Sequence, residues 1–234
     1  MPFQFKQFSV NDDKCAMKIG TDGCLLGAWA DISNAVNILD IGAGSGIVSL
    51  MLAQRSNALI DSVEIDKDAY TQCIENYKNS PWKERLHVFH NPLQEYVKSC
   101  TKKYDLIVSS PPYFVNSMKT NCSKRKLARH TDSLTFEELI SGAKRIMNLN
   151  AKFCVIIPTD IVKNFLDIAL IEGFFMSKKT EIEPKAKAKA LRTLLQMELI
   201  KKPCTQDNLA ILDKQGKAYT TEYISLTKDF YLKF

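Results

Sequence analysis

Short runs of apolar and β-branched residues alternate along the chain with longer amphipathic stretches. The apolar runs predict buried strands, and the stretches in which apolar residues recur every three or four positions predict helices. The expected strands are 36–41, 58–65, 86–89, 104–109 and 153–157, and the expected helices are 48–55, 66–79 and 136–147. Continuously apolar strands that alternate with helices are typical of a parallel sheet covered on both faces.

The end of the chain shows a different pattern. Residues 193–200 alternate only in part between apolar and polar, and the runs 209–212 and 219–226 flank a turn-like DKQG sequence at 213–216. Strands joined by hairpin-like turns are expected here, and an antiparallel edge on a parallel sheet fits this change. The sequence therefore predicts an α/β, Rossmann-like sandwich whose sheet is mostly parallel with an antiparallel edge strand.

No Pro-, Gly- or Ser-rich linker divides the sequence. A length of 234 residues suits one large domain or two small ones, and 45% hydrophobic residues are enough to fill a core. We therefore expect a single domain over residues 1–234, with residues 1–35 as an N-terminal extension packed on it.

Composition excludes several classes of protein. No apolar run approaches the roughly 20 residues that span a bilayer, so a membrane-spanning protein is excluded. Seven cysteines are scattered and never spaced as C-x-x-C, which indicates neither a disulfide framework nor a structural zinc site. The N-terminal residues contain no apolar stretch of signal-peptide length, so we expect a cytoplasmic protein, and further a monomer without a bound metal. The formal charge of +6 allows a polyanionic partner without requiring one.

A glycine-rich segment, DIGAGSG at residues 40–46, falls where the first expected strand ends and its helix begins. Its glycines are Gly42, Gly44 and Gly46. Glycines let the backbone turn tightly and approach a ligand without a Cβ in the way. The dinucleotide fingerprint G-x-G-x-x-G would need a glycine at the position of Ile47, so the spacing here is G-x-G-x-G. Alone, such a loop is either a ligand site or a plain strand-to-helix turn.

An acidic residue, Glu64, lies at the end of the second expected strand, 18 residues after Gly46 (64 − 46). A carboxylate there can accept hydrogen bonds from two ribose hydroxyls, although it could also be a solvated strand end. The combination of loop and acid resembles the S-adenosylmethionine (SAM) site of class I methyltransferases. That resemblance implies SAM as the cofactor, held by the three glycines and Glu64, with Asp40 fixing the loop or the methionine end and Asn91 near the adenine ring.

A second candidate site is the tetrapeptide of Ser110, Pro111, Pro112 and Tyr113, directly after the fourth expected strand, at the sheet edge where open α/β proteins bind ligands. The prolines fix the backbone and leave carbonyls free to accept hydrogen bonds, and the tyrosine ring can stack on a planar base. The sequence resembles the (Asn/Asp/Ser)-Pro-Pro-(Tyr/Phe) motif of methyltransferases that modify planar amino or amide nitrogens. By that resemblance the four residues are catalytic, with the Ser110 side chain and the Pro111 carbonyl holding the nitrogen. The alternative is a turn with an aromatic rim residue.

Further segments narrow the family. The chain resembles the bacterial tRNA(Val) adenine-N6-methyltransferases, which modify the adenosine next to the anticodon, at residues 3–30, 114, 125–130, 219–223 and 226–232. This resemblance extends over nearly the whole chain. It implies a SAM-dependent enzyme that methylates N6 of an adenosine in tRNA(Val), and it assigns Thr21 to the cofactor site.

Basic residues gather just beyond the tetrapeptide. Between residues 118 and 130 the chain contains no acid and five cations, Lys119, Lys124, Arg125, Lys126 and Arg129. Because phosphate contacts need cations on exposed elements near the site, we expect these five to bind RNA, the alternative being a solvated loop. A second lysine-rich run, KAKAKA at 185–190, fits RNA contact and a solvated face about equally well.

Three other functions remain open. Guanine-N2 methyltransferases of rRNA and glutamine-N5 methyltransferases of proteins use similar Pro-Pro tetrapeptides, and both resemblances are therefore compatible with residues 110–113. A third alternative is an RNA-binding module that has lost catalysis, with Ser110, in place of the more usual asparagine, as the lesion.

Substitution of the aromatic ring tests the role of the tetrapeptide. We expect Tyr113→Ala to weaken substrate binding or transition-state positioning by about 1 to 3 kcal/mol, because a base loses its stacking partner. Steady-state methylation kinetics measure this effect. Unchanged activity would show that Tyr113 does not contribute to the site.

Overall fold

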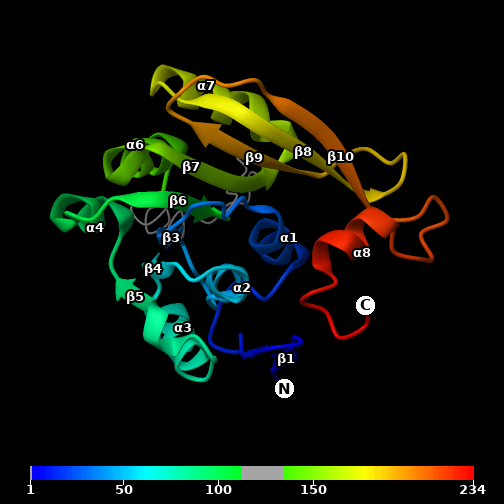
Figure 1. The fold of residues 1–234 in the computed structure, drawn as a ribbon, viewed down its shortest axis with the longest axis horizontal. Coiled ribbons are helices and arrows are strands. Elements are labelled where there is room, and N and C mark those ends of the chain that lie inside the picture. Colours follow the sequence, from blue (N-terminus) through cyan, green and yellow to red (C-terminus); the bar gives the residue numbers. More distant parts are fainter. Residues whose placement is uncertain (1, 112–133) are drawn as a thin grey trace, which may run out of the picture.

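The computed structural model describes residues 2–111 and 134–234, and a central sheet dominates it (Figure 1). The eight described strands of this sheet lie in the order β10-β8-β9-β7-β6-β3-β4-β5. They are β3 (Asn37–Ile41), β4 (Leu59–Glu64), β5 (Leu86–His90), β6 (Tyr104–Ser109), β7 (Met147–Pro158), β8 (Phe175–Lys185), β9 (Arg192–Glu198) and β10 (Thr205–Leu212). A separate antiparallel pair joins β1 (Phe3–Gln4) and β2 (Ser9–Val10).

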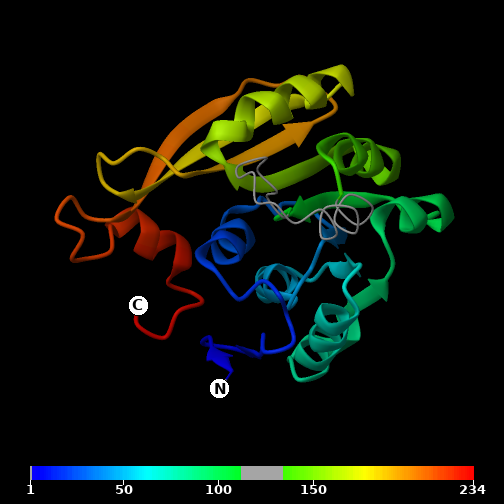
Figure 2. The same ribbon diagram turned by 180° about the vertical axis from the view of Figure 1, so that it is seen from behind.

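Helices cover both faces of the sheet, as Figures 1 and 2 show from opposite sides. They are α1 (Thr21–Trp29), α2 (Ile47–Arg55), α3 (Lys67–Lys78), α4 (Leu93–Ser99), α6 (Phe136–Ile146), α7 (Val162–Ile171) and α8 (Thr221–Thr227), with short 3-10 turns η1 (Lys83–Arg85) and η2 (Thr159–Ile161). Successive residues of β6 point to opposite faces, so Leu106 and Val108 join the core under α1 and α2 while Ile107 joins the core under α4, α6 and α7. The strands are thus buried on both faces, which explains their continuous apolar runs.

The antiparallel strand of the sheet is internal rather than at the edge. Strand β9 runs antiparallel to both of its neighbours, β7 and β8, whereas the edge strand β10 runs parallel to β8. The expectation of an antiparallel edge is corrected in this detail. The reason is the order of connections: β9 follows β8 through a short loop and inserts beside β7, and the chain then crosses back to place β10 outside β8.

The prediction of a strand at 219–226 is wrong, because most of this segment belongs to helix α8. Thr220 caps the helix, and its side-chain oxygen accepts a hydrogen bond from the backbone N–H of Tyr223 (3.2 Å). Tyr223 is buried in the core, and of the expected hairpin only an isolated bridge between Leu212 and Tyr219 is present. Capping and burial of one face therefore override the β-branched and aromatic composition of the segment.

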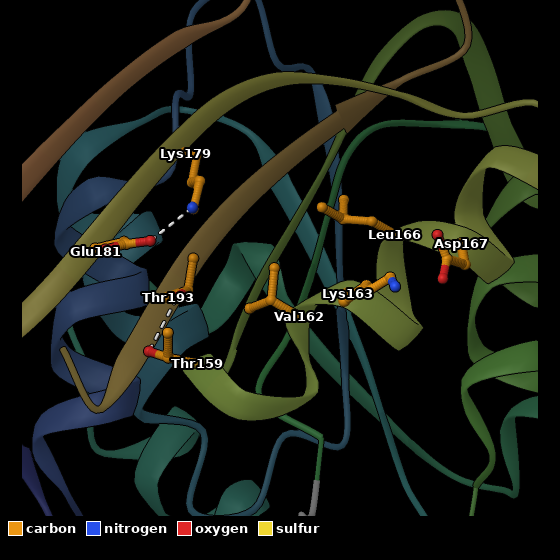
Figure 3. A pocket seen from close by; sticks show the side chains of 8 residues that line it. All are labelled: Thr159, Val162, Lys163, Leu166, Asp167, Lys179, Glu181 and Thr193. Carbon is orange, nitrogen blue, oxygen red and sulfur yellow. Dashed lines mark hydrogen bonds and ion pairs between the residues drawn. The ribbon is translucent and has the colours of Figure 1, made fainter. Parts of the chain in front are cut away.

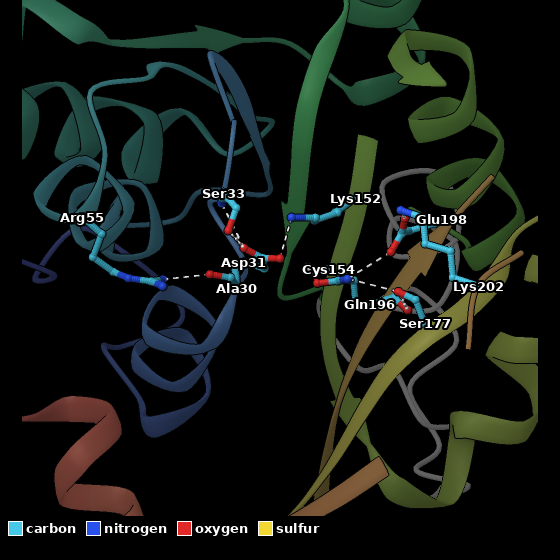
Figure 4. A network of polar contacts seen from close by, with 10 residues as sticks. All are labelled: Ala30, Asp31, Ser33, Arg55, Lys152, Cys154, Ser177, Gln196, Glu198 and Lys202. Carbon is cyan, nitrogen blue, oxygen red and sulfur yellow. Dashed lines mark hydrogen bonds and ion pairs between the residues drawn. The ribbon is translucent and has the colours of Figure 1, made fainter. Parts of the chain in front are cut away.

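The segment ahead of β3 packs closely on the rest of the chain. A Cβ at Gly27 of α1 would lie 2.8 Å from the Cβ of Met51 in α2, so glycine permits the close approach of the two helices. The Arg55 guanidinium donates to the carbonyls of Gly27 (2.8 Å) and Ala30 (2.9 Å) at the end of α1. Asp31 accepts from Lys152 of β7 (2.5 Å) in the polar network of Figure 4. Helix α1 is thereby fixed to both α2 and the sheet.

None of the helices within residues 2–111 and 134–234 combines the length and apolar character that crossing a membrane requires.

Candidate functional site

The glycine-rich loop between β3 and α2 has a left-handed backbone at three positions. The φ angles are +76° at Gly42, +55° at Gly44 and +82° at Gly46, a region that residues with a Cβ rarely adopt. The N–H of Gly42 donates to the carbonyl of Val63 (2.9 Å), and the N–H of Gly46 donates to that of Ala43 (2.8 Å). The loop therefore turns tightly at the carboxyl edge of β3 while staying attached to the neighbouring strand β4.

The three glycines meet different surroundings. A Cβ at Gly46 would lie 2.5 Å from Cε1 of Tyr77 and 3.0 Å from the sulfur of Cys73, so this position packs tightly against α3. A Cβ at Gly42 or Gly44 would meet no atom of the described residues within 4 Å. Gly46 is thus needed for packing, whereas Gly42 and Gly44 leave open space where a ligand can approach the backbone.

Glu64, the last residue of β4, lies directly beside this loop. Its side chain is 7% exposed, and its two carboxylate oxygens accept from the backbone N–H of Gly44 (2.7 Å) and of Asp66 (2.8 Å). Asp66 in turn caps α3, with its carboxylate accepting from the N–H of Ala69 (2.8 Å). Because a carboxylate oxygen has more than one lone pair, both oxygens can still accept from further hydroxyl groups.

Asp40 lies beneath the loop, inside the fold. Its side chain is buried and accepts a hydrogen bond from the hydroxyl of Ser49 in α2 (2.8 Å). Ser49 also contacts the hydroxyl of Ser62 (3.0 Å), which contacts that of Tyr77 (2.6 Å). Burial raises the pKa of Asp40 to about 7, because the charged form loses its hydration. The place of Asp40 suits support of the loop from below.

Asn76 of α3 was not singled out from the sequence, although it holds the loop from its other side. Its buried amide NH₂ donates to the carbonyls of Ser45 (2.8 Å) and Asn11 (2.8 Å), and its oxygen accepts from the N–H of Asn11 (3.0 Å). Asn76 therefore joins the loop, α3 and the N-terminal segment. The available signal was a polar residue on the buried face of an amphipathic helix, beside Cys73 and Tyr77.

The beginning of the tetrapeptide lies next to the glycine loop. Strands β3 and β6 pair with Ile41 opposite Ser109, so Ser110 and Pro111 leave β6 at the level where the loop leaves β3. The hydroxyl of Ser109 donates to the carbonyl of Ile41 (2.9 Å), which fixes this register. Adjacent strands are about 4.8 Å apart, so the two segments are neighbours at the carboxyl edge of the sheet. Ser110 is half-buried and Pro111 is buried.

Two further cofactor candidates lie near the same edge. Asn91 is exposed and follows β5, whose last residue, His90, pairs with Glu64. Thr21 is the exposed first residue of α1, and the adjacent Asp22 accepts from Arg192 (2.7 Å) at the start of β9. Asn91 is therefore one strand from Glu64, whereas Thr21 approaches from the side of β9.

The remaining candidates lie outside the described residues. They are Pro112 and Tyr113 of the tetrapeptide and the basic residues Lys119, Lys124, Arg125, Lys126 and Arg129. Within the described parts of the chain, no group of three or more His, Cys, Asp or Glu side chains could hold a metal ion.

A cavity of about 350 Å³ lies apart from the glycine loop, between α7 and strands β8 and β9 (Figure 3). Its walls include Leu166 of α7 and the hydroxyls of Thr159 and Thr193, which are 3.1 Å apart. An ion pair between Lys179 and Glu181 (2.6 Å) lines another side. The cavity contains none of the residues that the sequence assigned to a cofactor or a base.

Comparison with known proteins agrees with this architecture. The family model described as "Methyltransferase small domain" matches residues 24–162. A protein of Flavobacterium psychrophilum named tRNA1(Val) (adenine(37)-N6)-methyltransferase is 46% identical over 99% of this chain and 99% of its own length. A protein of the same name from Trichodesmium erythraeum is 45% identical over 99% and 98% of the respective chains.

Solved structures show the same fold. The crystal structure of a predicted O-methyltransferase from Agrobacterium tumefaciens has a TM-score of 0.71 at 19% identity, covering 89% of this chain and 96% of its own. The glycopeptide N-methyltransferase MtfA in complex with SAM has a TM-score of 0.56 at 10% identity, covering 78% and 100%. The predicted α/β fold class, the Rossmann-like sandwich of class I methyltransferases, is confirmed.

Alanine at two of the loop glycines separates packing from ligand contact. Each substitution places a Cβ in a left-handed backbone, which costs about 1 to 2 kcal/mol of folding free energy. We expect the free energy of unfolding of Gly46→Ala to fall by about 1 to 3 kcal/mol more, because the new Cβ collides with Tyr77. We expect Gly44→Ala to lose less stability but to bind SAM more weakly. Denaturant unfolding and titration calorimetry with SAM measure both. Equal stability losses, or unchanged SAM affinity in Gly44→Ala, would contradict the assignment.

The buried carboxyl of Asp40 predicts a dependence of stability on pH. Because the folded-state pKa of Asp40 lies near 7 and its ordinary value is 3.8, the folded chain holds this proton more tightly than the unfolded chain. This contribution to the free energy of unfolding is complete below about pH 4 and is lost as the pH rises towards about 7. Denaturant unfolding of the unsubstituted chain and of Asp40→Asn across this window measures it. We expect the difference between them to shift with pH in favour of the asparagine variant; parallel curves would show that Asp40 does not titrate in this way.

Proposed function

The chain belongs to the family of the tRNA1(Val) (adenine(37)-N6)-methyltransferases, and from this membership we propose that it methylates N6 of adenosine 37, next to the anticodon of tRNA(Val). Family membership confirms the predicted enzyme class and the predicted cofactor, SAM. The observation that carries the proposal is the position of Ser110 and Pro111 beside the glycine loop, since it brings a motif for planar nitrogens next to a cofactor cradle.

The residues present fit the cofactor. The open space at Gly42 and Gly44 admits a ligand against the backbone, and the carboxylate of Glu64 has lone pairs left for two ribose hydroxyls. Asp40 supports the loop through Ser49. Asn91, one strand beyond Glu64, lies on the side of the adenine ring, and Thr21 contributes from the N-terminal segment.

The tetrapeptide positions the base for reaction. SAM supplies an electrophilic methyl group on a sulfonium centre. The Ser110 hydroxyl and the Pro111 carbonyl hold the exocyclic NH₂, Pro112 fixes the backbone, and Tyr113 stacks on the adenine. No strong base is required, because the amino proton leaves after the nitrogen has become cationic; catalysis then comes from orientation and from polar groups placed at the developing charge.

Substrate recognition follows from the rest of the chain. Lys119, Lys124, Arg125, Lys126 and Arg129 contact the tRNA backbone next to the target base. Residues 1–234 act as one methyltransferase domain, and the contacts of α1 with α2 and β7 support this, because they attach residues 1–35 to the sheet. A monomeric state and a cytoplasmic location stay predictions from the sequence.

Product analysis tests the proposed reaction. Incubation with labelled SAM and an unmodified tRNA(Val) transcript is expected to give one N6-methyladenosine at position 37, and a transcript with guanosine at that position is expected to give none. Mass spectrometry of the digested RNA identifies the product. Absence of N6-methyladenosine while calorimetry still detects SAM binding would overturn the proposal. N2-methylguanosine in rRNA, or N5-methylglutamine in a protein, would instead support the alternative enzymes.

A further inference from the structure

Two lysine-rich connections lie side by side at the carboxyl ends of β8 and β10, near α8 (Figures 1 and 2). One joins β8 to β9 through residues 186–191, and the other is the turn at 213–217 after β10. The strands pair with Leu212 opposite Lys185, and the N–H of Ala186 donates to the carbonyl of Leu212 (2.9 Å). These contacts hold the two connections together as one surface.

This surface presents five lysines, which we call the lysine edge: Lys185, Lys187, Lys189, Lys214 and Lys217. All five are exposed. Within the described parts of the chain, none of their ammonium groups has an ion pair or a hydrogen bond. Elsewhere on the same strand, Lys179 is paired with Glu181, so the lysines at the end of β8 differ from this one in having no carboxylate partner.

The nearby carboxylates shape the two connections. Glu183 accepts from the backbone N–H of Lys187 (2.8 Å), and Asp213 accepts from that of Lys217 (2.9 Å). Hydrogen bonds from backbone N–H groups, of which that of Lys217 has the largest effect, hold the pKa of Asp213 below its ordinary value. Both acids bind main-chain amides rather than ammonium groups. Counting them, the surface still has a surplus of three positive charges (5 − 2) and a set of cations free to bind an anion.

The register of the sheet places the lysine edge relative to the target base. Ser109, Val155, Leu195 and Lys179 form one row across β6, β7, β9 and β8. Three strand intervals of about 4.8 Å give about 14 Å, and the six residues from Lys179 to Lys185 add about 20 Å along β8. The lysine edge is therefore roughly 25 Å from Ser109, towards the same carboxyl edge of the sheet. It is too far to touch the reacting base but well placed for another part of the same RNA.

We propose that the lysine edge binds backbone phosphates of the tRNA stem that carries the target loop. This inference rests on the proposed function, because it takes tRNA as the substrate. Flexible lysines are compact cations suited to phosphates, and the lysine edge contains no arginine with which to form planar, base-specific pairs. The substrate is thereby held at two places, with the base at the tetrapeptide and the stem at the lysine edge.

Charge removal with a matched control tests the proposal. The test variant is Lys185→Gln, Lys187→Gln and Lys189→Gln together. The control variant replaces three exposed lysines at the amino ends of the strands, Lys78→Gln, Lys83→Gln and Lys201→Gln. Both variants remove three positive charges, so they differ only in the place of the loss.

Fluorescence anisotropy with labelled tRNA(Val) at several salt concentrations gives the affinity and its salt slope. If each lysine binds a phosphate of the double-stranded stem, the negative slope of log K against log salt becomes shallower by about 3 in the test variant (three contacts at about 0.9 each). We expect tRNA affinity to fall about tenfold or more while SAM affinity stays that of the unsubstituted chain. The control variant is expected to keep the original slope. Equal slopes and affinities in the two variants would overturn the proposal.

A shorter substrate locates the contact. A trinucleotide centred on the target adenosine is too short to reach a surface about 25 Å away, so the test variant is expected to bind this oligonucleotide as well as the unsubstituted chain does. If the test variant loses as much affinity for the oligonucleotide as for full tRNA, the lysine edge does not bind the stem and the proposal fails. If the unsubstituted chain forms no N6-methyladenosine, the proposed function fails instead, while the binding comparison still decides the role of the lysine edge.

Discussion

The carboxylate of Glu64 holds the candidate site in shape, because it accepts hydrogen bonds from both segments that border the site. One oxygen binds the amide of Gly44 in the loop after β3, and the other binds the amide of Asp66 ahead of α3. On the far side of the loop, Asn76 binds the carbonyl of Ser45. A loop with three left-handed glycines has a large conformational freedom to lose, and these few hydrogen bonds select one form.

The parallel sheet then determines what can meet at this loop. Strands β3, β4 and β6 all end at the same edge, so the glycine loop, Glu64 and Ser110 come together although they are far apart in sequence. The strand order also separates the two proposed sets of site residues: those proposed for the cofactor end β3 and β4, and those proposed for the base follow β6. The N-terminal segment adds a wall, since Asn11 is bound to Asn76 of α3.

Much of this could be predicted because the relevant signals are local. The strand expected at 104–109 is present as Tyr104–Ser109, since the short apolar and β-branched run at 106–108 favours a strand that is buried on both faces of a parallel sheet. The spacing of the glycines and Glu64 likewise indicated a ligand loop at a strand end. Strand β8 was missed because lysines and glutamates interrupt its half-exposed pattern. Helix α8 was mistaken for a strand because the burial of one of its faces depends on tertiary contacts. The role of Asn76 was hidden for the same reason, because its partners lie 31 and 65 residues away.

The most direct measurement is the affinity of the unsubstituted chain and of Glu64→Gln for two ligands, SAM and its 2′,3′-dideoxy analogue, by titration calorimetry. The central claim is that Glu64 accepts from the ribose hydroxyls of SAM. It predicts that the substitution weakens SAM binding by about 1.5 to 3 kcal/mol more than it weakens binding of the dideoxy analogue, the range for hydrogen bonds to a charged group, because the lost contact with Gly44 or Asp66 affects both ligands alike. Equal weakening of both ligands would contradict the claim, because Glu64 would then act on the loop alone.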